Sequence, residues 1–497
     1  MLRNYLINHE RGAKRFFEIL PGLVSWNLIL FPYWGIFLFP EVVAYFILLF
    51  NVYWFYQAFG IAVTATISHL KIQATKDYDW MADVKNFPDW REVKHVVIIP
   101  TYKEPLHILR RTISSLAAQK LPTKQLIITL ATEFKEDKKE REEKANALKK
   151  EFKDVFGEFF VTVHKLAVGE AIGKASNERS AAIWVKENYL DKKKINLDYV
   201  TVTSCDADHV FHPKHYAVLT FKFLDCPNRY KRFWQPAVLL YNNIWRLPAI
   251  TRVPNILASI FILSMLPRRD RLINQQNYSL SFKLLHNTGY WDPDKIPEDW
   301  GIFFKAFFAN QGEIEVEPLY LPLYADAMES TTTWKTLKGQ YTQVRRWAWG
   351  VSDSSWVIYN YLTAENLGFW DKTTRVSTFI HGHFLWPVHW FLITIGISLP
   401  VAINPAFGRT TLGYLTPKIS STILTLALVF LAVMLVLDYI YKPQRPKNFP
   451  RWRAILMPLE FVLMPIATLI FTTLPGLDAH TRLMLGKYIE YKVTEKV

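Results

Sequence analysis

Cysteine is nearly absent from this sequence, which has only Cys205 and Cys226 among 497 residues. Two thiols are too few for a disulfide framework or for a zinc site built on cysteine. The chain also lacks internal repeats and the composition of disordered or collagenous proteins. These absences leave a folded protein whose stability and chemistry come from other residue types.

Half of the residues are hydrophobic, only 21% are charged, and the mean hydropathy is +0.04. A soluble enzyme of this size is usually more polar, and a membrane transporter is usually far less polar. We therefore expect a soluble body joined to several membrane spans. The net charge of +15, from 59 Lys and Arg against 44 Asp and Glu, needs its own explanation.

Apolar runs locate the expected membrane spans. The first two, 20–39 and 42–70, are each long enough to cross a bilayer as a helix. Only Pro40 and Glu41 separate them, which predicts an antiparallel hairpin. The C-terminal third contains three more candidate runs, at 376–407, 419–437 and 454–477.

Basic residues predict which side faces the cytoplasm. They cluster before the first run and between the last two runs, as Arg3, Arg11, Lys14, Arg15, Lys442, Arg445, Lys447, Arg451 and Arg453. The positive-inside bias places both segments, and the block 71–375, in the cytoplasm. Much of the net charge is then an orientation signal, and we expect no nucleic-acid partner.

The last run, 454–477, contains Glu460 and three prolines. Five complete spans would leave the C-terminus outside, whereas the basic residues near it favour the cytoplasm. We therefore expect a cytoplasmic C-terminus. The last run is then re-entrant, interfacial or divided into two short passes, which gives four to six spans.

The block 71–375 has the pattern of an α/β domain. Apolar and β-branched runs predict strands at 93–99, 125–131, 159–166 and 199–204, with helices at 106–118 and 175–189. This alternation predicts a mostly parallel, doubly wound sheet. Ligands bind such sheets beyond the carboxyl ends of the strands.

Acidic residues lie where ligands are expected. Asp206 and Asp208 follow the fourth predicted strand, one residue apart, and can hold a hard divalent cation that also binds phosphate oxygens. Such a pair also occurs in many loops without a metal. His209 and His212 beside it are either an additional ligand or structural residues. Further along, the Glu298–Asp299 pair opens a helical run and could instead serve only the helix dipole.

The order and spacing of these motifs resembles the membrane-embedded family 2 glycosyltransferases, the group of cellulose, chitin and hyaluronan synthases and ceramide glucosyltransferase. The resemblance covers nearly the whole chain, including a Gln-x-x-Arg-Trp motif at 343–347. It implies a cytosolic α/β GT-A domain with a mostly parallel, Rossmann-like sheet, flanked by transmembrane α-helices. It also implies a nucleotide-sugar donor, Mg²⁺ or Mn²⁺, and inversion at the anomeric carbon.

The resemblance assigns roles to individual residues. Asp299 matches the catalytic carboxylate, and Asp206 and Asp208 match the metal-binding pair. The residues that match the donor site are Thr101, Tyr102, Glu104, Glu133, Lys174 and Asp206. Glu133 stands where the family usually has Asp, which leaves the nucleotide open. The residues that match the diphosphate and acceptor site are Glu298, Gln343, Arg346 and Trp347. A match to the gating loop of cellulose synthase consists of Tyr491, Val493, Thr494 and Lys496.

These expectations divide the chain into five parts. They are an N-terminal transmembrane hairpin (1–75), a cytosolic GT-A glycosyltransferase domain (76–340), the Gln-x-x-Arg-Trp and interfacial helices (341–375), a C-terminal transmembrane region (376–477), and a cytosolic tail with the gating match (478–497).

The expected function is inverting transfer of a hexosyl group at the cell (inner) membrane from a nucleotide sugar, with a UDP-sugar favoured. The favoured acceptor is a growing polysaccharide. One alternative is single addition to a membrane lipid such as a polyprenyl phosphate, a diacylglycerol or a ceramide-like lipid. A second alternative is a non-catalytic membrane protein that senses nucleotide sugars.

Overall fold

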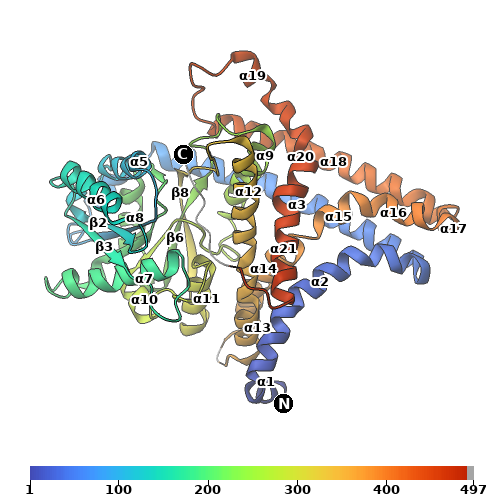
Figure 1. The fold of residues 1–497 in the computed structure, drawn as a ribbon, viewed down its shortest axis with the longest axis horizontal. Helices are drawn as coiled ribbons and strands as arrows, with labels where there is room; N and C mark the ends of the chain where they lie inside the picture. Colours follow the sequence, from blue (N-terminus) through green and yellow to red (C-terminus); the bar gives the residue numbers. More distant parts are fainter. Residues whose placement is uncertain (366, 490–497) are drawn as a thin grey trace.

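The computed structural model describes residues 1–365 and 367–489, and Figure 1 shows an α/β domain beside a set of long helices. The strands are β1 Lys94–Thr101, β2 Leu126–Glu133, β3 Glu158–His164, β4 Val200–Ser204, β5 Val210–Phe211, β6 Arg232–Leu239, β7 Tyr278–Ser281 and β8 Glu315–Tyr324. The helices of the N-terminal part and of the α/β domain are α1 Leu2–Asn8, α2 Glu10–Leu38, α3 Pro40–Asp77, α4 Trp80–Val84, α5 Leu106–Ala117, α6 Lys138–Phe152, α7 Lys174–Val185, α8 His215–Asp225, α9 Ala249–Met265, α10 Phe282–Asn287 and α11 Asp299–Ala309. The later helices are α12 Thr333–Ala348, α13 Ser354–Thr363, α14 Phe369–Leu385, α15 His389–Ile393, α16 Ile395–Ile403, α17 Pro405–Gly408, α18 Thr411–Tyr441, α19 Arg451–Leu456, α20 Met464–Thr468 and α21 Leu474–Met484.

The eight strands form one mixed sheet in the order β3-β2-β1-β4-β7-β6-β8-β5. β3, β2, β1 and β4 are all parallel, and β6 is parallel to β8. β7 is antiparallel to both of its neighbours, and the short β5 is antiparallel to β8. The expected α/β domain with a mostly parallel sheet and flanking apolar helices is confirmed.

Burial on both faces explains the composition of the first strands. In β1, Val96, Val97, Ile98 and Ile99 are fully buried, because helices cover the sheet on both sides, with α5 above it and α7 below it in Figure 1. A strand buried on both faces has a continuous apolar sequence rather than an alternating one. The predicted strands correspond to β1, β2, β3 and β4; β1, β2 and β4 share this burial, whereas β3 is an apolar edge strand in which Val163 is 49% exposed.

Four helical segments are long and apolar enough to cross a membrane: α2, α3, α18 and the segment Arg451–Met484. α2 and α3 meet at Phe39, and α16 and α18 are connected through α17. The two turns pack against each other, since Asn404 Nδ2 donates to the Ile36 carbonyl at 3.0 Å and Phe407 is buried against Val43 and Ile47. Both turns therefore lie at one end of the molecule, away from the sheet (Figure 1).

The run 376–407 forms a broken series of helices. α14 ends before Pro387, and the short α15 and α16 follow it. α16 then packs against α2, α3 and α18. The expected apolar run is therefore present, but it is divided among α14, α15, α16 and α17.

The segment Arg451–Met484 packs along the boundary between the sheet domain and the long helices. It contacts α9, α12 and α2, and in Figure 1 α20 and α21 run crosswise to α18. Arg252 of α9 is 1% exposed and binds both Glu460 carboxylate oxygens at 2.5 Å. Arg345 of α12 pairs with Asp478 at 2.8 Å. These ion pairs hold the segment against elements on the sheet side.

Candidate functional site

The carboxyl ends of four strands bring the predicted residues to one edge of the sheet. β2, β1 and β4 are adjacent and parallel, so Glu133, Tyr102 and Asp206 follow one another along this edge. β7 is antiparallel, so its beginning, at Asn277, meets the same edge. β8 ends there at Asp326. The topology therefore gathers polar side chains from distant parts of the chain.

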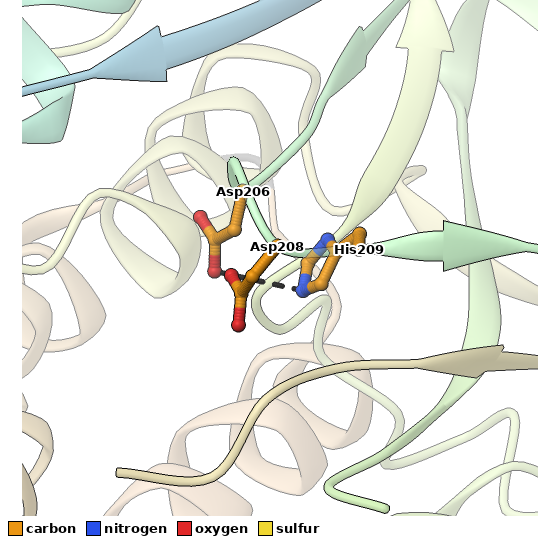
Figure 2. Close-up of side chains that lie close together, drawn as sticks. All are labelled: Asp206, Asp208 and His209. Atoms are coloured by element: carbon orange, nitrogen blue, oxygen red, sulfur yellow. Dashed lines mark ion pairs between the residues drawn. The ribbon is translucent and has the colours of Figure 1, made fainter. Parts of the chain in front are cut away.

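Asp206, Asp208 and His209 form a compact cluster with the composition of a metal site (Figure 2). One potential ligand atom from each lies within 4.8 Å of the others, and His209 Nε2 is 3.7 Å from Asp206 Oδ2. Carboxylate oxygens suit Mg²⁺ and Mn²⁺, and imidazole nitrogen is also found on transition metals. The structure thus brings His209 to the predicted pair, whereas His212 hydrogen-bonds the Lys214 amide instead.

The surroundings of His209 also fit a ligand. The Asn277 amide lies 3.2 Å from Nδ1, so the other ring nitrogen faces Asp206. Asn277 Oδ1 is buried and has no hydrogen-bond partner among the described residues. A metal-bound histidine donates its second N–H to an oxygen, and rotation of this amide would supply that oxygen.

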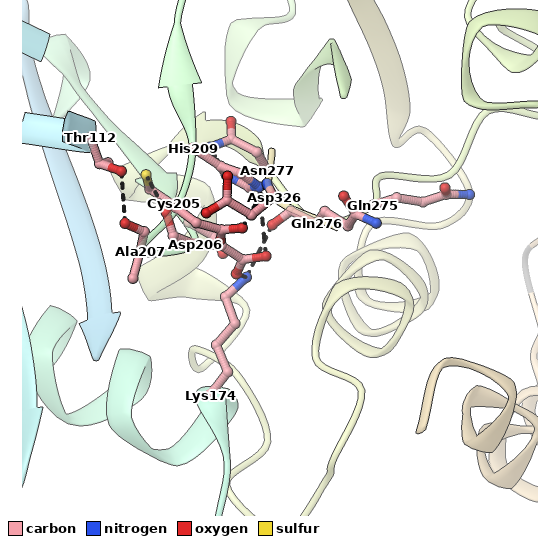
Figure 3. Close-up of polar contacts among 12 residues, drawn as sticks. Thr112, Lys174, Cys205, Asp206, Ala207, His209, Gln275, Gln276, Asn277 and Asp326 are labelled. Carbon is pink, nitrogen blue, oxygen red and sulfur yellow. Dashed lines mark hydrogen bonds and ion pairs between the residues drawn. The ribbon is translucent and has the colours of Figure 1, made fainter. Parts of the chain in front are cut away.

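Lys174, the first residue of α7, joins the metal cluster to the predicted catalytic pair, and Figure 3 shows its ammonium beside Asp206. Its ammonium lies 2.9 Å from Asp206, 2.7 Å from Glu298 and 3.8 Å from Glu178, and it donates to the Gln276 carbonyl at 3.0 Å. Burial lowers the pKa of Lys174, but the three carboxylates outweigh this effect and raise it well above its usual value. Lys174 is therefore a fixed positive charge.

Asp299, at the start of α11, occupies the other side of this arrangement. Its carboxylate accepts hydrogen bonds from the Gln276 amide at 3.2 Å and the Trp300 amide at 2.9 Å. Burial and the charge of Glu298 raise the pKa of Asp299 to about 7, against the hydrogen bonds and Lys174. A carboxylate with this pKa can accept a proton near neutral pH.

The loop after β1 is organised by Glu104. The Glu104 carboxylate accepts hydrogen bonds from the Thr101 hydroxyl at 2.7 Å and from the Tyr102 amide. All three predicted residues line the same cavity as Asp206. Glu104 thus shapes the loop in addition to lining the cavity.

Glu133, at the end of β2, is paired with His164. The imidazole Nδ1 lies 3.1 Å from Glu133, and Nε2 lies 3.0 Å from Glu170. Burial lowers the pKa of His164, but the two carboxylates outweigh this effect and raise it. The His164 side chain therefore holds Glu133 in place at the cavity wall.

α12 contributes the Gln-x-x-Arg-Trp residues to the cavity. Gln343, Arg346 and Trp347 all line it, because residues three and four apart share one face of a helix. Gln343 is 6% exposed, and its Oε1 atom has no hydrogen-bond partner among the described residues.

All described residues to which the family resemblance assigned a role line one cavity of about 1890 Å³, whereas His212 does not. Near the sheet edge its walls carry the polar residues described above. Farther away it continues between the long helices, past aromatic residues and histidines: Trp54, His381, Trp386, His389 and Trp390. The predicted gating residues Tyr491, Val493, Thr494 and Lys496 lie outside the described residues.

Three residues near the site were not predicted. Asp326, after β8, donates its backbone amide to Asp208 at 2.9 Å and pairs with Arg111 at 2.6 Å. Glu178 is fully buried below Lys174, where burial raises its pKa to about 8. Gln276 has a left-handed backbone, with φ of 57°, and binds Asp299 and Lys174 through its main chain. Only Asp326 had a sequence signal, an acidic residue after an apolar run.

No family model matches the chain, and no curated protein matches it. Among solved structures it is similar to the mannosyltransferase PcManGT from Pyrobaculum calidifontis in complex with GDP-Man and Mn²⁺, with 12% identity over 83% of this chain and 99% of that chain and a TM-score of 0.39. It is also similar to S. aureus TarS, with 14% identity, 67% and 54% of the two chains covered and a TM-score of 0.34. GalNAc-T7 with UDP, GalNAc and Mn²⁺ gives 14% identity, 59% of each chain covered and a TM-score of 0.34. At such identities, the function has to be argued from the residues of this chain.

Proposed function

We propose that this protein is an inverting glycosyltransferase of the family 2 type that uses a nucleotide-sugar donor. The observation that carries the proposal is the position of Lys174 between Asp206 of the metal-type cluster and Glu298, beside Asp299. Transfer of the sugar creates negative charge on the leaving diphosphate and requires removal of a proton from the attacking hydroxyl. The site provides both: Lys174 carries the fixed positive charge, and Asp299, next to its partner Glu298, is the proton acceptor.

In the proposed reaction the acceptor hydroxyl oxygen attacks the anomeric carbon from the side opposite the diphosphate. The new C–O bond forms as the bond from carbon to the diphosphate oxygen breaks, and the nucleoside diphosphate leaves. Asp299 accepts the proton of the attacking hydroxyl, because it is the carboxylate with a pKa near 7. Lys174 and Arg346 stabilise the charge on the leaving diphosphate, and Trp347 offers a flat surface for a sugar ring.

Asp206, Asp208 and His209 would hold Mg²⁺ or Mn²⁺. A divalent ion at this place would offset the negative charge of the diphosphate. The nucleoside would lie against the loop after β1 and the end of β2, beside the metal cluster. The residues there are Thr101, Tyr102, Glu104 and Glu133.

For the acceptor we favour a membrane lipid over a growing polysaccharide. The far part of the cavity is bounded by apolar side chains of α18 and α20, namely Leu424, Ala427, Leu431, Met434, Met464 and Pro465. Such walls suit a hydrocarbon chain, which loses contact with water there. These α18 and α20 side chains offer a polysaccharide no hydrogen bonds, and its polar contacts there would come from other lining residues, among them the histidines and tryptophans of the other helices.

We further propose that the protein is embedded in the cell (inner) membrane with its α/β domain in the cytoplasm. The support is the four long apolar segments together with the basic residues around 3–15 and 442–453. The donor nucleotide sugar would then enter from the cytoplasm and the acceptor from the bilayer.

The purified full-length chain in detergent, given a panel of UDP- and GDP-sugars and a lipid extract, tests these proposals. We expect release of nucleoside diphosphate and a single labelled, lipid-soluble product. EDTA should abolish turnover, and Mn²⁺ or Mg²⁺ should restore it. A ladder of water-soluble products would show polymerisation instead, and donor binding without turnover would favour a sensor.

Asp299→Asn should retain donor binding and lose at least about a hundredfold in transfer rate, as expected for removal of a general base. The matched control is Asp294→Asn, a nearby exposed carboxylate outside the cavity lining. Near-normal turnover of Asp299→Asn would refute the assignment of Asp299.

A further inference from the structure

A group of basic and polar side chains lies along the cavity between the catalytic residues and the apolar helices. Arg268 and Arg271, from the loop after α9, line the cavity together with His381 of α14 and Tyr53 of α3. The two arginines are close enough for their positive charges to act on the His381 imidazole, which is hydrogen-bonded to the Tyr53 hydroxyl. We call Arg268, Arg271, His381 and Tyr53 the basic cluster.

Arg268 is half-buried, and among the described residues no carboxylate lies within ion-pair distance of its guanidinium. Within residues 1–365 and 367–489 its side chain makes no hydrogen bond and no ion pair, whereas Arg269 pairs with Glu315 and Arg271 with Asp270. Burial and the neighbouring charge of Arg271 lower the pKa of Arg268 and outweigh the opposing charge of Asp270. Because partial removal from water without an ion-pair partner is unfavourable for a guanidinium, its position indicates an anionic ligand.

α3 has a glycine at the point where this guanidinium lies. A Cβ atom at Gly60 would be 2.7 Å from Arg268 Nη2. Glycine inside a helix costs about 1 kcal/mol relative to alanine. The sequence therefore keeps the space beside α3 open for Arg268 at a cost in helix stability.

The basic cluster also lies between the two functional parts of the cavity. Trp300, next to Asp299 in the chain, lies beside α14 at the residue after His381, since a Cβ atom at Gly382 would be 3.5 Å from the Trp300 ring. On the other side the cavity wall includes Leu428 of the long apolar helix α18 and Phe261 of α9, which are 55% and 46% exposed. A ligand here would have one end near Asp299 and the other in the bilayer.

We propose that the basic cluster binds the phosphate of an anionic phospholipid, whose acyl chains lie in the apolar part of the cavity and whose headgroup hydroxyl is the acceptor. This inference rests on the proposed function and names its acceptor class. The planar fork of Arg268 matches two phosphate oxygens, and the position beside the long apolar helices matches the depth of a lipid headgroup. Asp299 would then take the proton of the headgroup hydroxyl.

The test measures lipid binding by native mass spectrometry of the full chain in detergent, without any donor. The probe is phosphatidylglycerol, and the comparisons are diacylglycerol with the same chains and glycerol phosphate without chains. Three variants are compared: Arg268→Gln, which removes the charge; Gly60→Ala, which displaces the flexible guanidinium; and Arg269→Gln, the adjacent arginine outside the cavity lining. Arg268→Lys, which keeps the charge, checks that a loss reflects charge rather than folding.

We expect Arg268→Gln to weaken phosphatidylglycerol binding about tenfold or more, as for loss of a charged hydrogen-bonding partner. Gly60→Ala should weaken it in the same direction, Arg268→Lys should retain part of it, and Arg269→Gln should leave it unchanged. Equal binding by Arg268→Gln and Arg269→Gln would overturn the proposal. So would diacylglycerol binding as tightly as phosphatidylglycerol, or glycerol phosphate displacing the lipid.

Nucleoside diphosphate release by the same preparations separates the two proposals. Arg268-dependent lipid binding without turnover of any donor would refute glycosyl transfer and leave the lipid site standing. Donor turnover with lipid binding that ignores Arg268 would refute the lipid site alone.

Discussion

The side chain of Asp299 should give glycosyl transfer its pH dependence. Because burial and Glu298 raise its pKa to about 7, the carboxyl is protonated below this pH and cannot accept a proton. We expect kcat/KM to rise with pH up to about 7 and then to level off, as read from a pH profile of initial rates. A flat profile between pH 5 and 8 would contradict the role of Asp299.

The raised pKa of Asp299 also makes the free energy of unfolding depend on pH. The folded state holds the Asp299 proton up to about pH 7, whereas an unfolded chain releases it near its ordinary pKa of 3.8. The folded state therefore binds more protons between these values, and this group's contribution to stability falls as pH rises through the window. Asp299→Asn should remove that part of the pH dependence in thermal unfolding.

Lys174 should be essential for stability as well as for donor binding. Lys174→Met leaves Glu178, Asp206 and Glu298 together without their shared cation. We expect a loss of about 3 kcal/mol or more in the free energy of unfolding, typical of a broken buried ion pair. Lys186→Met, which removes a surface pair with Asp191, is the control and should cost less than about 1 kcal/mol. Equal effects of the two substitutions would contradict the central position of Lys174.

At the scale of elements, the Arg252–Glu460 ion pair should hold the segment Met457–Leu463 against α9. Glu460→Gln leaves a buried guanidinium without its carboxylate and should cost about 3 kcal/mol in thermal unfolding. The double variant Arg252→Met with Glu460→Leu should recover most of this loss, since an apolar pair of similar size can replace a buried ion pair.

The control for this prediction is Glu142→Gln, from an exposed pair with Lys138 at 3.9 Å, which should change stability by less than about 0.5 kcal/mol. No loss in Glu460→Gln would show that the segment is held by apolar packing alone.

The first half of the sheet could be predicted from the sequence, whereas the second half could not. β1 to β4 are continuous apolar runs that follow turn residues, a pattern with few alternatives. β6 contains Pro236, where its pairing with β8 shifts register, and β8 contains Pro318 and Pro322. Proline argues against a central strand, so β6 and β8 could not be predicted from the sequence. Asp326, which follows β8, was missed for the same reason.

The site shows the same division. Asp206 and Asp208 could be found because they directly follow a predicted strand. The contacts of Lys174 with Glu298 and Gln276 join residues more than 100 positions apart, and no local pattern encodes such a meeting. Glu460 looked like an interruption of an apolar run because its partner Arg252 is 208 positions away.

At the scale of the whole molecule, we expect an even number of membrane crossings, with the apolar segment Arg451–Met484 remaining on the sheet side. The α2–α3 turn and the α17 region lie together at one end, and Arg451–Met484 packs on the sheet side. We expect residues near Glu41 and Arg409 to face one side of the membrane, and Lys85 and Lys487 the other.

Single-cysteine labelling can check this topology in intact vesicles. Cys226→Ser provides the background, because Cys205 is buried. An impermeant maleimide should label only one of two pairs in vesicles of a single orientation. The first pair is Glu41→Cys and Arg409→Cys, and the second is Lys85→Cys and Lys487→Cys. Labelling of Lys487→Cys together with Glu41→Cys would exclude a cytoplasmic C-terminus.

The ion pair between Arg345 and Asp478 has a geometrical consequence for α12. Successive residues of an α-helix point about 100° apart around its axis, so fastening Arg345 to α21 prevents α12 from rolling. Arg345 is the immediate neighbour of Arg346, and Gln343 and Trp347 are each two residues away. The direction in which these three side chains point into the cavity is therefore set from outside it, by a helix that contributes none of them.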